Sequence, residues 1–381
     1  MNEVDQITAQ GLLSRLRSES APVLVDTRST ADFNEWHIDG AINYRFTPDD
    51  GFDPDDFQEQ TGIGPSQPII TICGKGVASK ALAEDLTSIG YESVKTVQDG
   101  MRGWSRVYEV AALPTRDPEI DIMQVFRPAK GCLGYMVGWG PAAEAAVIDP
   151  TQHIDQFLDL TTDTAHEITH VIDTHIHADH ISGGRALADK VDATYYLSNR
   201  AGDRSVAFDY EPLGRNEVVS VGPLELKAIA TPGHTSEMMS ILVNDDAVFT
   251  GDTLFVDSVG RTELQFEDGE VTNAAHQMYE SLHGSLLSLP DAITVLPGHS
   301  STSWQSGDDG VFTSIGDVRT NLDLLQLDEE RFVANFTDAL PDKPPNYETI
   351  IEINTGNKEL PSPEEAEELE LGPNRCAISD S

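Results

Sequence analysis

Residues 171–184, with the sequence VIDTHIHADHISGG, constrain the fold of this chain more than any other stretch. Three histidines and two aspartates follow a β-branched apolar run that ends at Ile172. The run predicts a buried strand, and side chains at every second residue of an extended chain point to the same side. The chain has 11 histidines in 381 residues, so His175, His177 and His180 form a rare cluster. Because convergent imidazoles and carboxylates bind first-row divalent metals, we predict a metal site at the end of this strand.

Three positions downstream repeat one pattern, in which Gly-His or Gly-Asp follows an apolar, β-branched run. These positions are His234, Asp252 and His299. Each is expected in a loop at a strand end, where functional residues are commonly found. Loops at one edge of a β sandwich can bring such residues together, so all four blocks are predicted to build one metal site.

The order of these blocks resembles the ligand pattern of the metallo-β-lactamase superfamily, which runs His-x-His-x-Asp-His, Gly-His, Gly-Asp and Gly-His. The resemblance implies that the second part of the chain folds as an αββα sandwich. It also implies that the metal ligands and the residues that support them are His175, His177, Asp179, His180, His234, Asp252 and His299.

Two metal schemes of this superfamily use these residues, and the residues alone do not choose between them. In the dinuclear zinc scheme, Asp252 bridges two zinc ions and a metal-held hydroxide attacks a thioester or amide carbonyl. One zinc is held by His175, His177 and His234, and the other by Asp179, His180 and His299.

In the mononuclear scheme, His175, His234 and Asp252 bind a single Fe(II) ion. The other histidines and Asp179 then hold these ligands in place. The resemblance therefore implies one Fe(II) per chain as cofactor, with one or two Zn(II) ions as the alternative.

Three features favour iron. The segment 260–264, Gly-Arg-Thr-Glu-Leu, resembles the Gly-Arg-Thr-Asp-Phe segment of persulfide dioxygenases. Residues 340–354 and the Gly-Pro-Asn-x-Cys-Ala motif at 372–377 resemble the same proteins and their rhodanese fusions. The sequence also leaves no room for the long helical domain with which glyoxalase II proteins hold their thiol substrate. The resemblance makes Arg261, with Thr262, a candidate contact for the carboxylate of a thiol carrier, and a structural salt bridge is the equal alternative for Arg261.

The N-terminal part of the chain is predicted as a separate α/β unit. Residues 22–27, 68–72 and 94–97 are expected as strands and residues 79–89 as a helix. Cys73 directly follows the second of these strands. A nest of loop amides, the start of the helix and a lysine charge would together stabilise a sulfur anion at Cys73. The residues of this loop are Gly74, Lys75, Gly76, Val77, Ala78 and Ser79.

This region resembles a rhodanese domain over most of residues 8–110. The matching motifs are Val-Asp-Thr-Arg, His-Ile-Asp-Gly-Ala, the Cys73 loop and Gly-Met-Arg-Gly-Trp. The resemblance implies that Cys73 carries a persulfide and passes one sulfur between donor and acceptor. The family often has arginine where this chain has Ala78, which weakens thiosulfate as the expected donor. An inactive domain used for docking is the alternative, although inactive copies usually lose the cysteine.

We therefore expect a rhodanese-like domain at 1–112, a linker at 113–122, a metallo-β-lactamase-fold domain at 123–355 and an acidic tail at 356–381. The linker carries two prolines and four charges. Cys132 is expected at the entry to a strand near the metal site, either as an inert buried residue or in a redox role. Cys376 is expected to be incidental.

The charge of the chain limits its partners and setting. Its formal net charge is −41, which disfavours nucleic acid and anionic membrane surfaces. Acidic residues are dispersed along the whole chain, as in proteins that work in molar salt, where screening acts over about 3 Å. The polar N-terminus predicts no signal peptide, and no apolar run approaches a membrane span. Three widely spaced cysteines predict no disulfide framework, so a reducing cytoplasm is expected.

Taken together, the resemblances imply a persulfide dioxygenase fused to an N-terminal rhodanese, coupled through the shared persulfide. Its expected partners are O2, sulfite or thiosulfate, and the persulfide of a small thiol similar to glutathione or γ-glutamylcysteine. A homodimer is expected by analogy alone. A zinc thioesterase of the glyoxalase II type and a sulfur-delivery module with a structural metal remain the alternatives.

Overall fold

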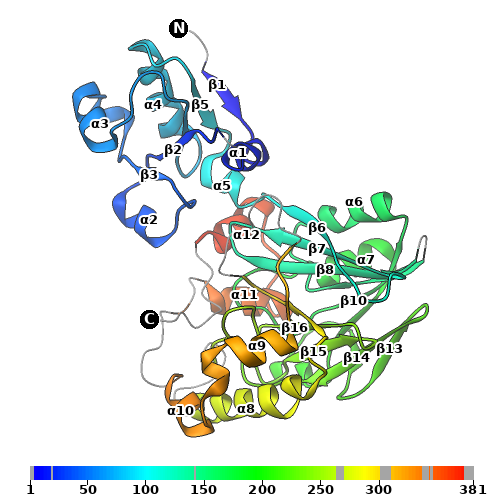
Figure 1. Ribbon diagram of the computed structural model, residues 1–381. Helices are drawn as coiled ribbons and strands as arrows, with labels where there is room; N and C mark the ends of the chain where they lie inside the picture. The colour runs from blue at the N-terminus through cyan, green and yellow to red at the C-terminus, as the bar shows by residue number, and fades with distance from the viewer. Residues whose placement is uncertain are drawn as a thin grey trace. The chain divides into compact units, whose positions relative to one another are not determined.

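Two units make up the chain in the computed structural model (Figure 1). The first consists mainly of Met1–Tyr108, and the second of Glu109–Phe126 and Gly131–Glu370. The structure describes residues 4–18, 20–140, 143–262, 270–300, 310–336, 343 and 346–372. Among these residues, no helix combines the length and apolar character needed to cross a membrane.

A five-stranded parallel sheet forms the centre of the first unit, in the order β1-β5-β4-β2-β3. Its strands are β1 Asp5–Ile7, β2 Val23–Asp26, β3 Ile42–Asn43, β4 Ile69–Ile72 and β5 Val94–Val97. On β4, Ile69 packs into one apolar cluster, and Ile70 and Ile72 pack into another. Both faces of the strand are therefore buried, as is usual in a parallel sheet covered by helices. The helices are α1 Ala9–Leu16, α2 Thr30–Glu35, α3 Pro54–Thr61, α4 Val77–Ser88 and α5 Gly100–Trp104.

The second unit contains two mixed sheets packed face to face. The seven-stranded sheet has the order β12-β11-β10-β9-β8-β7-β6, and the six-stranded sheet runs from β13 to β18 in sequence order. Tyr135 and Ile148 of the first sheet share one core with Ile241 and Phe249 of the second. The rings of Tyr135 and Phe249 lie 4.9 Å apart. The first sheet consists of β6 Glu109–Leu113, β7 Ile120–Arg127, β8 Cys132–Trp139, β9 Glu144–Ile148, β10 Glu167–Ile172, β11 Thr194–Ser198 and β12 Glu211–Leu213. The second consists of β13 Val218–Val221, β14 Leu224–Ala230, β15 Met239–Val243, β16 Ala247–Gly251, β17 Thr294–Pro297 and β18 Thr313–Ser314.

Helices cover the two outer faces of this sandwich (Figure 1). Met278 and Leu282 of α8 pack on Val248 and Val295 of the six-stranded sheet, and α7 packs on β10 and β11. The predicted αββα sandwich is therefore confirmed. The helices are α6 Asp155–Thr164, α7 Gly184–Val191, α8 Val271–Gly284, α9 Ile315–Asn321, α10 Glu329–Ala334, α11 Tyr347–Asn354 and α12 Pro363–Glu370.

The predicted linker 113–122 differs from the structure. β6 pairs antiparallel with β7, with Leu113 opposite Ile122, so the segment belongs to a hairpin of the second unit. Ile120 and Ile122 lie in the core of the sandwich, and Asp121 between them is exposed. This alternation is typical of a half-buried strand.

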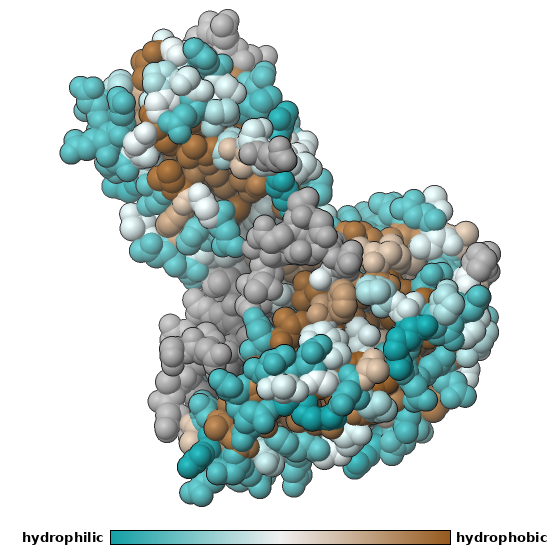
Figure 2. Space-filling model, in the orientation of Figure 1, coloured by the Kyte–Doolittle hydropathy of each residue, from teal (hydrophilic) through white to brown (hydrophobic). Residues whose placement is uncertain are grey.

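The C-terminal region also differs from its prediction as an acidic tail. Residues 350–354, predicted only as a short apolar stretch, belong to helix α11. The Glu-rich run 364–370, for which the sequence allows a weak helix, forms α12, and the burial of Glu370, which is 1% exposed, is what departs from a tail. Hydrophilic residues cover much of the visible face of each unit, and a patch of hydrophobic residues lies at the centre of that face in the first unit (Figure 2).

Candidate metal centre and persulfide loop

Loops from both sheets carry the predicted metal ligands. His175 follows β10 of one sheet, whereas His234 and Asp252 follow β14 and β16 of the other. β10 ends at Ile172, as the apolar run predicted, but the extended chain that was expected to align alternate histidines does not continue beyond it. The Asp149 carboxylate accepts hydrogen bonds from the Thr174 N–H at 2.7 Å and from its hydroxyl at 2.8 Å. These bonds take the place of a strand partner and turn the chain into a loop.

His175, His234 and Asp252 form a buried donor group whose ligand atoms all lie within 4.8 Å of one another. Asp252 Oδ2 lies 3.5 Å from His234 Nε2 and 3.8 Å from His175 Nε2. Two atoms bound to a metal at about 2.1 Å are separated by about 3.0 Å at a right angle and by about 3.4 Å at the tetrahedral angle. His175 Nε2 and Asp252 Oδ2 have no hydrogen-bond partner among the described residues. The three residues therefore fit a first-row divalent metal after small adjustments.

The protonation of this group suits metal binding. His234 donates its Nδ1–H to the Arg261 carbonyl at 2.7 Å, which leaves Nε2 with its lone pair facing the group. Burial lowers the pKa of His175 well below its ordinary value, and nearby His177 lowers it further. Burial alone would raise the pKa of Asp252, but the charge and hydrogen bond of His299 outweigh it and hold the pKa far below its usual range. A neutral imidazole at His175 and a carboxylate at Asp252 result.

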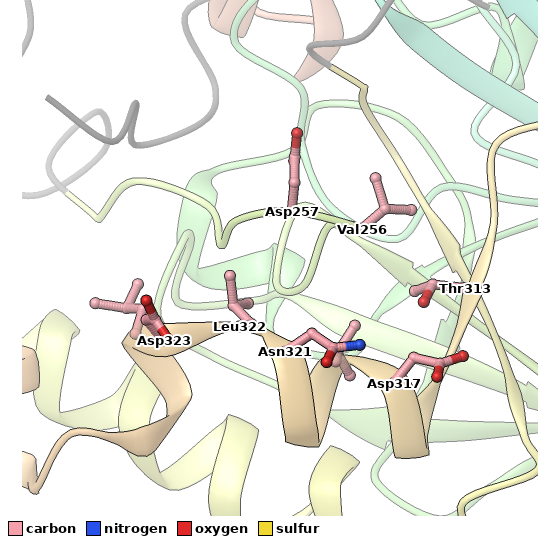
Figure 3. Close-up of a pocket in the computed structure, with 9 residues that line it drawn as sticks. Val256, Asp257, Thr313, Asp317, Asn321, Leu322 and Asp323 are labelled. Carbon is pink, nitrogen blue, oxygen red and sulfur yellow. The ribbon is translucent and has the colours of Figure 1, made fainter.

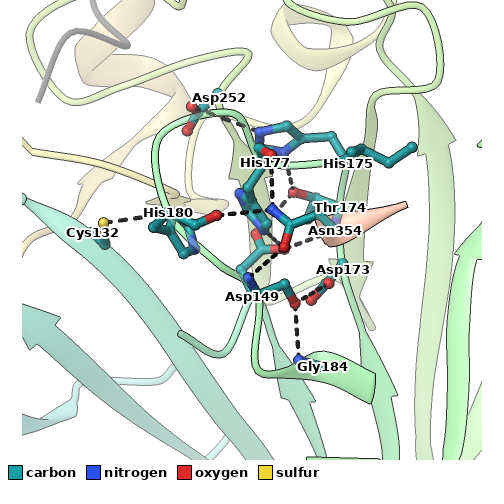
Figure 4. Close-up of polar contacts among 12 residues, drawn as sticks. Cys132, Asp149, Asp173, Thr174, His175, His177, His180, Gly184, Asp252 and Asn354 are labelled. Atoms are coloured by element: carbon teal, nitrogen blue, oxygen red, sulfur yellow. Dashed lines mark hydrogen bonds and ion pairs between the residues drawn. The ribbon is translucent and has the colours of Figure 1, made fainter. Parts of the chain in front are cut away.

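A second buried group joins Cys132 to three predicted site residues, Asp179, His180 and His299. Asp179 lies 2.9 Å from His299 Nε2 and 3.0 Å from His180 Nδ1. The sulfur of Cys132 lies 3.6 Å from Asp179 and 3.7 Å from His180 (Figure 4). Burial alone would raise the pKa of the Cys132 thiol, but His180 outweighs it and lowers the pKa to about 7. The two groups meet at His299, whose Nδ1 lies 2.6 Å from Asp252.

His177 belongs to a third group, with Asp149 and Asp173. Its Nε2 lies 3.4 Å from Asp149 Oδ1, although its ring centroid is 4.2 Å from that of His175 (Figure 4). Asp173 accepts hydrogen bonds from the hydroxyls of Ser182 and Tyr195. The dinuclear scheme requires His177 to share a metal with His175 and His234, and this arrangement does not group it with them.

Two further features lie outside these donor groups. Arg261 and Thr262 are fully buried. The backbone carbonyl of Arg261 accepts the hydrogen bond that orients His234. Glu263 and Leu264 lie outside the described residues, as does Cys376. A separate pocket of about 320 Å³ is lined by four apolar residues, three aspartates, Thr313 and Asn321, and contains no member of the three groups (Figure 3). The aspartates are Asp257, Asp317 and Asp323.

In the first unit, Cys73 lies between β4 and α4, as predicted. The Gly76 N–H and the Ser79 hydroxyl donate to its sulfur at 3.1 and 3.3 Å. The hydroxyl of Thr96 donates to that of Ser79 at 3.0 Å. Helix α4 begins at Val77 and not at residue 79, because Gly76 adopts a left-handed conformation with φ +83°. Gly100 is required close by, because a Cβ there would lie 2.0 Å from the Cys73 carbonyl oxygen.

Sequence reasoning missed several residues of the metal region. Asp149 directly follows β9 and precedes proline, so its strand-end position was a usable signal. Asp173 lies within the histidine stretch itself. No local pattern marks Asn354, whose amide reaches the loop from α11.

Comparisons with known proteins match each unit separately. Residues 8–107 match the family described as "Rhodanese-like domain", and residues 131–299 match "Metallo-beta-lactamase superfamily". Among solved structures, ETHE1 from Myxococcus xanthus is 30% identical with a TM-score of 0.54, covering 62% of this chain and 98% of that chain. A metallo-β-lactamase from Staphylococcus aureus is 27% identical with a TM-score of 0.58, covering 64% of this chain and 75% of that one.

Two kinds of curated relative match part of this chain. "Persulfide dioxygenase ETHE1, mitochondrial" of Mus musculus is 28% identical over 182 residues, which is 47% of this chain and 67% of the relative. "Hydroxyacylglutathione hydrolase" of a Polaromonas species is 32% identical over 168 residues, which is 43% of this chain and 60% of that protein. Relatives named as dioxygenases and relatives named as hydrolases therefore both match this chain.

Proposed function

Because the chain belongs to the metallo-β-lactamase superfamily and carries a rhodanese-like domain before its metal domain, we propose that it is a persulfide dioxygenase coupled to sulfur transfer. Its substrate is the persulfide of a small thiol, and its oxidant is O2. Sulfur leaves as sulfite, or as thiosulfate after transfer. The similarity to ETHE1 proteins supports this assignment over other reactions of the superfamily.

The observation that carries the proposal is the orientation of His177, whose Nε2 lies 3.4 Å from Asp149 Oδ1 although its ring centroid is 4.2 Å from that of His175. His175, His234 and Asp252 form one donor group, and His177 is grouped with two aspartates. Two imidazoles and one carboxylate are the set of protein ligands used by non-haem Fe(II) oxygenases, in which several metal positions stay open. A two-zinc hydrolase would need His177 as a ligand.

The overall reaction balances as R-S-SH + O2 + H2O giving R-SH + H2SO3. Fe(II), when bound, supplies the reactivity with O2 that protein side chains lack. Asp252 is held by His299, and His234 by the Arg261 carbonyl, so neither ligand needs to reorient during turnover. Water is needed only to release sulfite, and the metal-ligand side chains are at most 2% exposed. Burial therefore limits side reactions of the persulfide with solvent.

Cys73 provides the sulfur-transfer step. Its thiolate attacks the terminal sulfur of R-S-SH, forms Cys73-S-SH and releases R-S⁻. Sulfite then takes the terminal sulfur, which gives thiosulfate and restores the thiolate. The hydrogen bonds from Gly76 and Ser79 stabilise the sulfur anion at both stages. Carrying both activities on one chain raises the effective concentration of the shared intermediate.

Thioester hydrolysis is the second candidate. One observation favours it, because Asp179, His180 and His299 form a further donor group that contacts Asp252 through His299. The match to a hydroxyacylglutathione hydrolase points the same way.

Metal content and O2 uptake together test the proposal. The full chain is purified without oxygen in high salt, its metals are counted, and O2 uptake is followed with the persulfides of glutathione and of γ-glutamylcysteine. One iron per chain with uptake is the expected result. Two zinc ions per chain, no uptake and hydrolysis of a thioester would refute it.

Two matched variants sharpen this test. His234→Ala should abolish iron binding, whereas His177→Ala should keep one iron per chain. Equal loss of iron in both variants would contradict the assigned ligands. Cys73→Ser should abolish sulfur transfer and leave O2 uptake intact, so loss of both activities would contradict the division of labour.

A further inference from the structure

The loop of residues 173–183 supplies at least one member of each of the three donor groups. It begins where β10 ends and finishes where α7 starts, so most of its backbone has no helix or sheet partner. Buried backbone groups need hydrogen-bond partners, and the direction of each histidine ring depends on the backbone that carries it. Whatever holds this backbone therefore sets the geometry of the metal centre.

Asn354, the last residue of α11, holds three of these backbone groups. Its Nδ2 donates to the carbonyls of His177 and His180, both at 2.9 Å. Its Oδ1 accepts from the N–H of Ser182, also at 2.9 Å. The NH2 group of a side-chain amide donates two hydrogen bonds and its oxygen accepts, so an aspartate of the same size could accept from Ser182 but could not donate to the two carbonyls. Figure 4 shows Asn354 beside the histidine loop.

Glu370, at the end of α12, holds a fourth group. Its Oε1 accepts from the N–H of Ile181 at 2.7 Å, and the residue is 1% exposed. The side chain of Ile181 packs into one apolar cluster with Ile353 of α11 and Ala366 of α12. Polar and apolar contacts from the same two helices thus converge on residues 177–182, almost two hundred positions away in the sequence.

We propose that α11 and α12 form a clamp, through Asn354 and Glu370, that fixes the metal-binding loop and thereby the direction of its donor side chains. The clamp keeps the His177 ring turned toward Asp149 and the His180 ring toward Asp179. Asn354 and Glu370 are positioning residues, because they touch the backbone of the donors and not the metal. In the mononuclear scheme the clamp acts on the ligand His175 through the loop that carries it, and in the dinuclear scheme it also acts on the ligands His177 and His180 directly.

Cobalt binding tests the clamp without substrate or O2. Co(II) is titrated into the metal-free full chain against a competing chelator, and its visible absorption spectrum is recorded. Asn354→Ala and Asn354→Asp should each weaken Co(II) binding by about tenfold to a hundredfold, the usual effect of removing a group that orients a ligand. Both should also change the spectrum, because the ligands are reoriented.

The matched control is Asn357→Ala. Asn357 lies three residues further on, and its Nδ2 donates to the Ser205 carbonyl at 2.8 Å and to the Thr355 hydroxyl at 2.9 Å, away from the loop. It should keep the wild-type spectrum and affinity within about twofold, well below the tenfold step. Glu370→Ala removes a different bond of the clamp and serves if the Asn354 variants fail to fold. The inference would be overturned if Asn354→Asp kept the wild-type Co(II) affinity and spectrum, or if Asn357→Ala lost as much Co(II) affinity as the Asn354 variants. It would also be overturned if the wild-type chain failed to bind Co(II).

Discussion

Gly298 lies directly against the metal-ligand carboxylate, and this contact allows a worked prediction. A Cβ at residue 298 would lie 2.6 Å from Asp252 Oδ1 and 3.0 Å from the carbonyl carbon of Gly251. Ordinary contacts of a Cβ begin near 3.4 Å. Gly298→Ala therefore requires the Asp252 carboxylate to move by about 0.8 Å, the difference between 3.4 and 2.6 Å, whereas metal–ligand distances tolerate about 0.2 Å.

The expected result is a loss of metal affinity of about tenfold to a hundredfold, equivalent to about 1.4–2.8 kcal/mol. The dissociation constant for Co(II) is measured against a chelator, and thermal unfolding of the metal-free variant reports whether it still folds. Gly284→Ala is the matched control. It lies at the end of α8, and no atom lies within 4 Å of the added Cβ. It should leave metal affinity unchanged and stabilise the helix by up to about 1 kcal/mol.

A folded Gly298→Ala variant that binds Co(II) as tightly as the wild type would refute this reasoning. An equal loss of affinity in Gly284→Ala would refute it as well, because the effect would then not depend on contact with Asp252.

Three further predictions concern the sulfur site, acid and salt. Ser79→Ala should slow alkylation of Cys73 by iodoacetamide by about tenfold to a hundredfold, because a hydrogen bond to a charged sulfur contributes about 1.5–3 kcal/mol. Ser88→Ala on the same helix should leave the rate unchanged, and mass spectrometry of the labelled peptide measures both. Because the pKa of Asp252 is depressed in the folded chain, its carboxylate should stabilise the metal-free fold above about pH 4, and this stabilisation should be lost as the pH falls further. The free energy of unfolding of Asp252→Asn, measured in urea, should therefore depend less on pH below about pH 4. The net charge of −41 should make the melting temperature rise when KCl increases from about 0.1 M to about 2 M, and a flat or falling curve would contradict the salt-adapted interpretation.

Local sequence patterns were sufficient for the elements that carry the chemistry. The β-branched runs before Cys73, His234 and Asp252 predicted strands β4, β14 and β16, because strand propensity and strand-end position are encoded in neighbouring residues. The resemblances to two families likewise came from short motifs, and both domains were confirmed by the family matches. The linker prediction was wrong because a hairpin turn can contain the same prolines and charged residues as a linker.

Only the tertiary structure decided how the seven predicted metal-site residues divide into groups. His177 joins Asp149 because the loop turns away from the strand at Thr174, and Cys132 joins Asp179 because β8 begins at Cys132, which is bridged to His299. Asn354 reaches the His177 carbonyl across 177 positions of sequence. The sequence by itself determined which residues carry donor atoms and which strand each of them follows. Their partners follow from packing between distant segments, and distances of a few ångströms between such segments leave no periodic trace in the sequence.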